Sequence, residues 1–149
     1  MKILIVEDDE HKSSQILELI NMAETPCNTV IVDNVWDAVR SLRESIPDKL
    51  ILDMSLPSHK ALPGEGTPVP LPTGGIEILF ELKKKKQMSL PILILTQYPE
   101  ILIEGEPVPV DKSAGVFAEE YGFKNIEACY YDHVDRSFWK KSTIYFLRK

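Results

Sequence analysis

The chain has 149 residues, of which 44% are hydrophobic and 27% are charged, and its formal net charge is −6. This length predicts one domain with a proper core, and the acidic balance argues against direct binding to nucleic acid, which needs a basic surface. No apolar run approaches the roughly 18 residues of a membrane span, and the N-terminus lacks the shape of a signal peptide.

The first half of the chain alternates short apolar runs with amphipathic stretches. The short runs predict buried strands, and apolar residues spaced three and four apart predict helices. These elements are a strand at 2–7, a helix at 10–23, a strand at 28–33, a helix at 35–46 and a strand at 49–53. This βαβαβ order predicts a parallel sheet with right-handed crossovers.

A dense run of proline and glycine interrupts the order at 57–75 and predicts a long loop. The loop is either a lid over the sheet edge or a surface insertion, and both readings stay open. Beyond it we predict a helix at 76–87, a strand at 92–96, a second proline-containing loop at about 97–111, a helix at about 112–121, a strand at 126–131 and a helix at 135–147. No repeat or second domain is visible, so residues 1–149 are expected to form one domain with two insertions.

Polar side chains follow three of the predicted strands. Glu7 and Asp8 come after the first strand, Asp53 ends the third and Thr96 ends the fourth. Ligands of open α/β sheets lie at the carboxyl ends of the strands, so we expect these side chains in one pocket. Carboxylates this close recruit a cation, and Mg²⁺ or another hard divalent cation suits an all-oxygen site. Such a cation would let Asp53 attack a phosphoryl group. Asp9 is expected only to cap the next helix.

These motifs resemble the receiver domain of two-component response regulators. The resemblance rests on Ile3-Leu4-Ile5-Val6-Glu7-Asp8-Asp9, on Leu50-Ile51-Leu52-Asp53-Met54-Ser55-Leu56-Pro57 and on Ile94-Leu95-Thr96, and in element order it covers nearly the whole chain. It implies the flavodoxin-like (βα)5 fold, an α/β three-layer sandwich with a five-stranded parallel sheet in the order 2-1-3-4-5.

The resemblance also implies roles for individual residues. Asp53 would be the phosphoacceptor, and the hydroxyl of Thr96 would contact the phosphoryl group. The metal would be bound by Asp53, by Asp8 directly, by Glu7 through water and by the main-chain carbonyl of Ser55.

The chain departs from the family in one place. The family normally carries Lys-Pro after the fifth strand, and that lysine binds the phosphoryl group. Here the region reads Cys129-Tyr130-Tyr131-Asp132-His133-Val134-Asp135, and the expected replacement is Asp132 or His133. An Asp there would repel a phosphoryl anion by about 4 kcal/mol at 4 Å and an effective dielectric near 20. Another lysine, such as Lys112 or Lys140, would have to reach in from elsewhere.

Three functions compete. The first is a stand-alone receiver of a phosphorelay, which takes a phosphoryl group on Asp53 with Mg²⁺ and signals through protein contacts. Its partners would be a sensor histidine kinase or phosphotransfer protein and an unknown downstream protein, with no membrane partner. The second is a degenerate pseudo-receiver that binds a partner without phosphorylation. The third, a metal-dependent phosphohydrolase, lacks a second Asp at the position of Ser55, so the chain is not expected to be an enzyme beyond slow self-dephosphorylation.

The two cysteines indicate the cellular compartment in which the protein is expected. Cys27 and Cys129 have no metal-type spacing, and the implied strand order puts them at opposite edges of the sheet. Reduced thiols in a cytoplasmic protein are therefore expected.

Overall fold

The computed structural model describes residues 1–23, 26–66 and 68–149. Over these residues the chain forms a central five-stranded sheet, helices on both of its faces and a small separate hairpin. The elements are β1 (Lys2–Val6), α1 (Glu10–Met22), β2 (Asn28–Val32), α2 (Val35–Glu44), β3 (Lys49–Leu52), α3 (Gly74–Lys84), β4 (Ile92–Thr96), β5 (Glu100–Ile103), β6 (Glu106–Pro109), α4 (Val110–Tyr121), β7 (Ile126–Tyr130) and α5 (Ser137–Arg148).

The central sheet is parallel throughout, with the strand order β2-β1-β3-β4-β7. Because β7 is the fifth strand of this sheet along the chain, the expected order 2-1-3-4-5 is confirmed. Val6 on β1 pairs with Leu52 on β3, and Leu52 pairs with Ile94 on β4. These three strands therefore run in register, and the residues that follow them meet at the carboxyl edge of the sheet.

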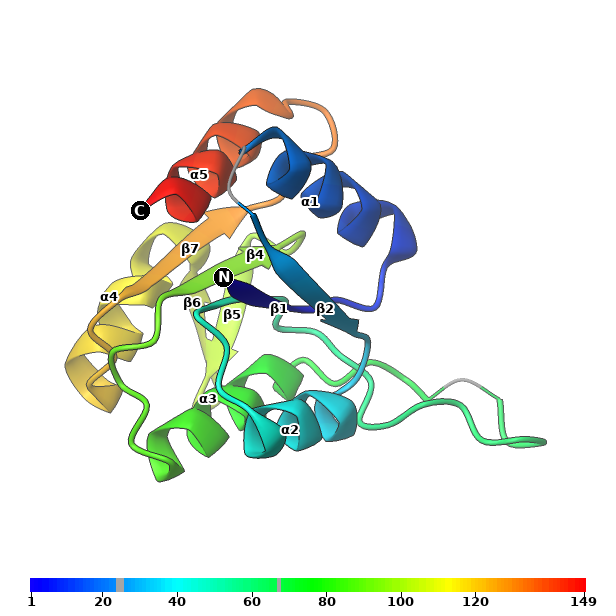
Figure 1. Ribbon diagram of the computed structural model, residues 1–149. Helices are drawn as coiled ribbons and strands as arrows, with labels where there is room; N and C mark the ends of the chain where they lie inside the picture. Colours follow the sequence, from blue (N-terminus) through cyan, green and yellow to red (C-terminus); the bar gives the residue numbers. More distant parts are fainter. Residues whose placement is uncertain (24–25, 67) are drawn as a thin grey trace.

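Helices cover both faces of the sheet (Figure 1). α1 and α5 pack on one face over a core that includes Ile3, Leu93 and Trp139. α2, α3 and α4 cover the other face over a larger core that includes Leu4 and Phe117. Every residue of β3 and β4 is buried, which explains why these strands read as continuous apolar runs in the sequence.

The first insertion extends past α2 and away from the sheet (Figure 1). Its ends are joined, because the Leu56 N–H donates to the Leu71 carbonyl (3.1 Å) and the Leu71 N–H donates to the Leu56 carbonyl (2.8 Å). The tip around Gly64 is exposed, and Thr67 lies outside the described residues. Of the two readings of 57–75, the projecting tip fits a surface insertion, whereas the returning limb at Val69 and Pro70 lies beside the edge of the sheet.

The second insertion differs from the loop expected at 97–111. β5 and β6 form an antiparallel hairpin there, joined by Glu104 and Gly105. Both turn residues have positive φ, 52° and 81°, which is typical of a tight two-residue hairpin turn. Each strand of a two-stranded hairpin has an open edge, and an open edge tolerates proline. The prolines at 107 and 109 therefore did not exclude a strand.

The remaining predicted elements exist, and their boundaries lie within three residues of the predicted ones. Asp9 caps α1 as expected, since its side chain accepts from the N–H groups of His11 and Lys12. Among the described residues, no helix combines the length and the apolar character that a membrane crossing requires.

Candidate functional site

Three carboxylates meet at the carboxyl edge of the sheet. Glu7 and Asp8 follow β1, and Asp53 follows β3, the strand paired with β1. One carboxylate oxygen from each residue lies within 4.8 Å of the other two. The sequence motifs therefore bring together the three acidic side chains that they predicted, and this separation is short enough for one ion to contact all three.

Asp53 is held rigidly but has one oxygen without a hydrogen bond. The residue is 1% exposed, and its N–H donates to the Val6 carbonyl at 3.0 Å. Its Oδ1 accepts from the Met54 N–H at 2.8 Å. Its Oδ2 is buried and has no hydrogen-bond partner among the described residues. A buried carboxylate oxygen in this condition is suited to a cation or to covalent chemistry.

Ionised carboxylates are destabilised in the pocket formed by Glu7, Asp8 and Asp53. Burial, opposed by the charge of Lys12 and helped by that of Asp53, raises the pKa of Glu7 to about 8. Burial also raises the pKa of the half-buried Asp8, and the charge of Asp53 adds to the rise. A divalent cation would remove this penalty, and the all-carboxylate donor set with its free Asp53 oxygen fits a hard cation such as Mg²⁺ or Mn²⁺.

Lys12, in the first turn of α1, is a site residue that the sequence motifs did not reveal. Its ammonium group lies 2.6 Å from Glu7 Oε1 and 3.7 Å from Asp53 Oδ2. It also donates to the Leu95 carbonyl at 2.5 Å and to Gln97 Oε1 at 3.2 Å. Among the described residues, Lys12 is therefore the buried lysine beside the carboxylates, whereas Lys112 is exposed on α4 and the Lys140 ammonium lies 5.9 Å from the Trp139 ring centre.

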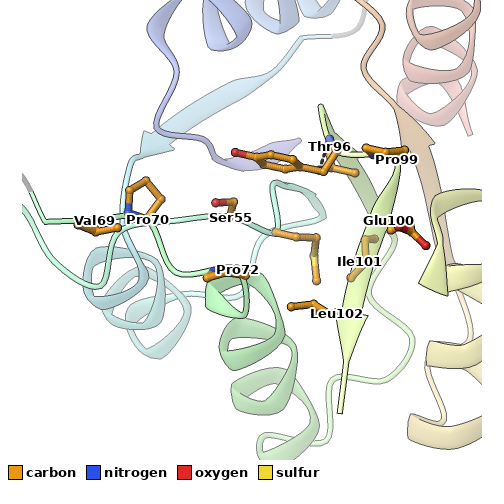
Figure 2. A pocket seen from close by; sticks show the side chains of 11 residues that line it. Ser55, Val69, Pro70, Pro72, Thr96, Pro99, Glu100, Ile101 and Leu102 are labelled. Carbon is orange, nitrogen blue, oxygen red and sulfur yellow. Dashed lines mark hydrogen bonds between the residues drawn. The ribbon is translucent and has the colours of Figure 1, made fainter. Parts of the chain in front are cut away.

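Ser55 and Thr96 lie on the side of an apolar cavity of about 550 Å³ (Figure 2). The returning limb of the first insertion forms one wall through Val69 and Pro70, and β5 forms the opposite wall. Thr96 is fully buried, and its hydroxyl oxygen accepts from the Tyr98 N–H at 3.2 Å. Both residues therefore lie at this edge of the sheet, in the turn after β3 and at the end of β4.

The end of β7 differs from what the sequence suggested. Tyr131 follows the strand, donates its N–H to the Thr96 carbonyl at 2.6 Å and places its ring 5.3 Å from the Lys12 ammonium. The Asp132 carboxylate instead accepts from the N–H groups of Val134 and Asp135. His133 is exposed and packs edge-on against the Tyr131 ring. The residue beside the pocket is thus an uncharged tyrosine, and Asp132 is engaged in the turn before α5.

Solved receiver domains share this fold. The phosphorylated cyanobacterial phytochrome response regulator RcpA aligns with a TM-score of 0.60 at 19% identity, over 99% of this chain and 88% of that one. The Mn²⁺-bound response regulator Rcp1 aligns with a TM-score of 0.61 at 16% identity, over 99% and 88% of the two chains. At these identities the likeness establishes the flavodoxin-like receiver fold alone.

Sequence relatives identify the family. No protein-family model matches the chain. The Detocs response regulatory protein DtcB of Vibrio alginolyticus is 69% identical over 147 residues, 98% of this chain and 99% of that protein. The uncharacterized protein y4jS of Sinorhizobium fredii is 34% identical over 126 residues, which are 82% of this chain but only 28% of y4jS. The fold, the acid pocket and the relationship to DtcB together show that this chain belongs to the receiver domains of response regulators.

Proposed function

We propose that this chain is a stand-alone phosphorelay receiver that accepts a phosphoryl group on Asp53 in the presence of Mg²⁺. The observation that carries the proposal is the convergence of Glu7, Asp8 and Asp53 within 4.8 Å, with Asp53 Oδ2 free of hydrogen bonds. A sensor histidine kinase or phosphotransfer protein would donate the phosphoryl group, and the signal would pass through contacts with a downstream protein. DtcB, which is 69% identical over 98% of this chain, is named a response regulatory protein, which supports a role in signalling.

The metal would be held by Asp8 and Asp53, by the carbonyl of Ser55, and by Glu7 through water. It would supply positive charge that lets an anionic carboxylate meet an anionic phosphoryl group. The raised pKa of Glu7 and of Asp8 supports this assignment, because each reports a place where negative charge needs compensation. The chain would act as a signalling domain, with at most slow self-dephosphorylation.

Acetyl phosphate with Mg²⁺ tests the proposal directly. Mass spectrometry should show an adduct of about 80 Da on the wild-type protein, the mass of one phosphoryl group. The adduct should be absent from Asp53→Asn and present in the matched control Asp111→Asn, which makes the same change at an exposed position on α4. A folded, cation-binding wild type that never acquires the adduct would rule the proposal out.

One observation favours a second function, a phosphorylation-independent binding module. The apolar cavity between the first insertion and β5 offers space for a partner side chain beside Thr96. Capture of a partner from the native host should separate the two functions. Loss of binding in Asp53→Ala supports the phosphorelay receiver. Binding that is unchanged in Asp53→Ala supports the phosphorylation-independent binding module.

A further inference from the structure

Lys12 occupies a position where simple physical chemistry disfavours a lysine. Its side chain is 1% exposed, although lysines are almost never fully buried unless they are paired. It also lies in the first turn of α1, where the helix dipole presents positive charge. Both effects oppose a cation at this position. Compensation comes from the acid pocket, which indicates that the pocket determines the placement of Lys12.

The ammonium group already uses its three donors. Its contacts are Leu95 O at 2.5 Å, Glu7 Oε1 at 2.6 Å and Gln97 Oε1 at 3.2 Å. Asp53 Oδ2, at 3.7 Å, lies just beyond hydrogen-bond distance. Of the three partners, the Gln97 amide is uncharged and the most distant, so it is the partner that another acceptor would displace most easily.

Phosphorylation would place such an acceptor next to Lys12. In the transfer, a carboxylate oxygen of Asp53 bonds to phosphorus while the bond from phosphorus to the donor breaks, and the donor leaves with the bonding electrons. The product carries two negative charges on its phosphoryl oxygens, beside the charges of Glu7 and Asp8. With Glu7 and Asp8 both ionised, a divalent cation alone leaves a net charge of −2 in the pocket, and Lys12 reduces it to −1.

We infer that Lys12 binds the phosphoryl group carried by Asp53, and so takes over from α1 the task of the lysine that is missing after β7. The inference rests on the proposed function. The positions of Tyr131 and Gln97 agree with this inference. The Tyr131 ring centre lies 5.3 Å from the ammonium group. Gln97 Oε1 accepts a hydrogen bond from the same group at 3.2 Å, and a phosphoryl oxygen would replace it as the acceptor.

A competing role for Lys12 is that of counter-ion to Glu7 alone. Both roles predict that Lys12→Met affects the pocket, so that variant does not separate them and could also fold poorly. The pair Glu7→Gln and Glu7→Gln/Lys12→Met does separate them. In this pair the Glu7 charge is already gone, so removing the lysine no longer leaves the Glu7 carboxylate buried without its cation.

The experiment measures the rate of adduct formation from acetyl phosphate with Mg²⁺, and Mn²⁺ affinity by fluorescence, with folding checked by circular dichroism. Removing Lys12 from the Glu7→Gln background should slow adduct formation roughly tenfold to a hundredfold, as expected for loss of a charge-assisted hydrogen bond. Mn²⁺ affinity should stay equal or increase, because a neighbouring positive charge is removed. Lys12→Arg, which keeps the charge, should retain more of the rate than Lys12→Met. Lys49→Met, which removes the other buried lysine, should leave the rate unchanged.

Equal rates for Glu7→Gln and Glu7→Gln/Lys12→Met, with both proteins folded, would overturn the inference and make Lys12 a counter-ion only. A tenfold fall in Mn²⁺ affinity that fully accounts for the rate would also overturn it. Failure of the proposed function looks different, because the wild-type protein itself then forms no adduct.

Discussion

Among the residues that the structure describes, two lysines are buried, one at each end of the central sheet. Lys12 lies at the carboxyl edge among carboxylates. Lys49 begins β3 at the amino edge, is 4% exposed, and donates to the carbonyls of Phe146, Leu147 and Lys149 at 2.6, 3.0 and 3.3 Å. The same residue type thus serves two different environments within one small domain.

The partners explain the difference between these sites. The carbonyls around Lys49 end α5, where the helix dipole presents negative charge, so the dipole and the cation stabilise each other. Lys12 meets the opposite end of a helix dipole and is retained by charged side chains that a metal or a phosphoryl group would also contact. A buried cation among main-chain carbonyls therefore contributes mainly to stability, and one among carboxylates marks a site for chemistry.

The largest expected effect is on stability and follows from Lys49→Met. This change leaves the terminal carbonyls of α5 without their buried donor, and we expect a loss of about 2–4 kcal/mol in unfolding free energy. Urea unfolding measures it. The change in stability on adding Mg²⁺ should be unaltered, because Lys49 lies at the other end of the sheet. A variant as stable as the wild type would show that water caps α5 equally well.

The next effect concerns the cation. Binding to the native state alone should add about 2.7 kcal/mol of stability at a hundredfold excess of Mg²⁺ or Mn²⁺ over its Kd, and EDTA should remove it. Thermal unfolding with and without the cation checks this. Asp8→Asn should lose most of the gain and Lys49→Met should retain it. An equal gain in Asp8→Asn would place the cation elsewhere.

Much of the carboxyl edge was predictable because it depends on strand order. Two short apolar runs, each ending in acid, predict parallel strands whose ends meet, and the structure brings Glu7, Asp8 and Asp53 together. Parallel strands are buried on both faces, and each of these runs is apolar throughout, so the sequence itself indicates that they pair in a parallel sheet. The roles of these residues in phosphorylation remain predictions.

Lys12 and the hairpin were harder to predict, because long-range contacts decide both. Lys12 lies four residues before Ile16, on the buried face of α1, and this spacing was the available signal. A lysine near a helix end is nevertheless usually solvated, and only the pocket across the sheet makes burial favourable. In the second insertion, the density of proline favours a loop, although buried Ile101 and Ile103 alternate with exposed neighbours and Glu104-Gly105 forms a tight turn.

A smaller effect on stability is expected from Gly75→Ala, at the carboxyl edge of the sheet. A Cβ at this position would lie 2.7 Å from the Asp53 carbonyl oxygen and 2.7 Å from the Met54 sulfur, so Gly75→Ala must displace the turn that carries Asp53. We expect a loss of about 1–3 kcal/mol from overpacking. Adduct formation should slow as well.

Gly115→Ala is the matched control. A Cβ there meets nothing within 4 Å, and the residue lies exposed inside α4, so alanine should stabilise the protein by about 0.5–1 kcal/mol. Urea unfolding of both variants gives the comparison. Two alanine variants with the same change in stability would mean that the close approach of Gly75 to Asp53 places no constraint on the site.

The smallest expected effect on stability concerns Glu104. Its hydrogen-bond partner is the neutral hydroxyl of Tyr121, whereas the partner of Glu7 is the charged Lys12. The Tyr121 hydroxyl on α4 donates to Glu104 in the hairpin turn at 2.7 Å, and this bond, helped by burial, raises the pKa of Tyr121 to about 12. The unfolded value is near 10, so between about pH 10 and 12 the folded protein binds more protons, and stability falls as pH rises through that window. The contribution is fully present below pH 10.

Tyr121→Phe should therefore lose about 1 kcal/mol at pH 8, and its stability should fall less steeply than that of the wild type above pH 10. Absorbance titration of tyrosinate should show one tyrosine fewer titrating near pH 12 in the variant. Glu104→Gln keeps an acceptor but removes the charge, so it should move this titration towards 10 and leave most of the stability. If Tyr121 titrates near 10 in the wild type, the hydroxyl is free of Glu104, and this hydrogen bond does not join the hairpin turn to α4.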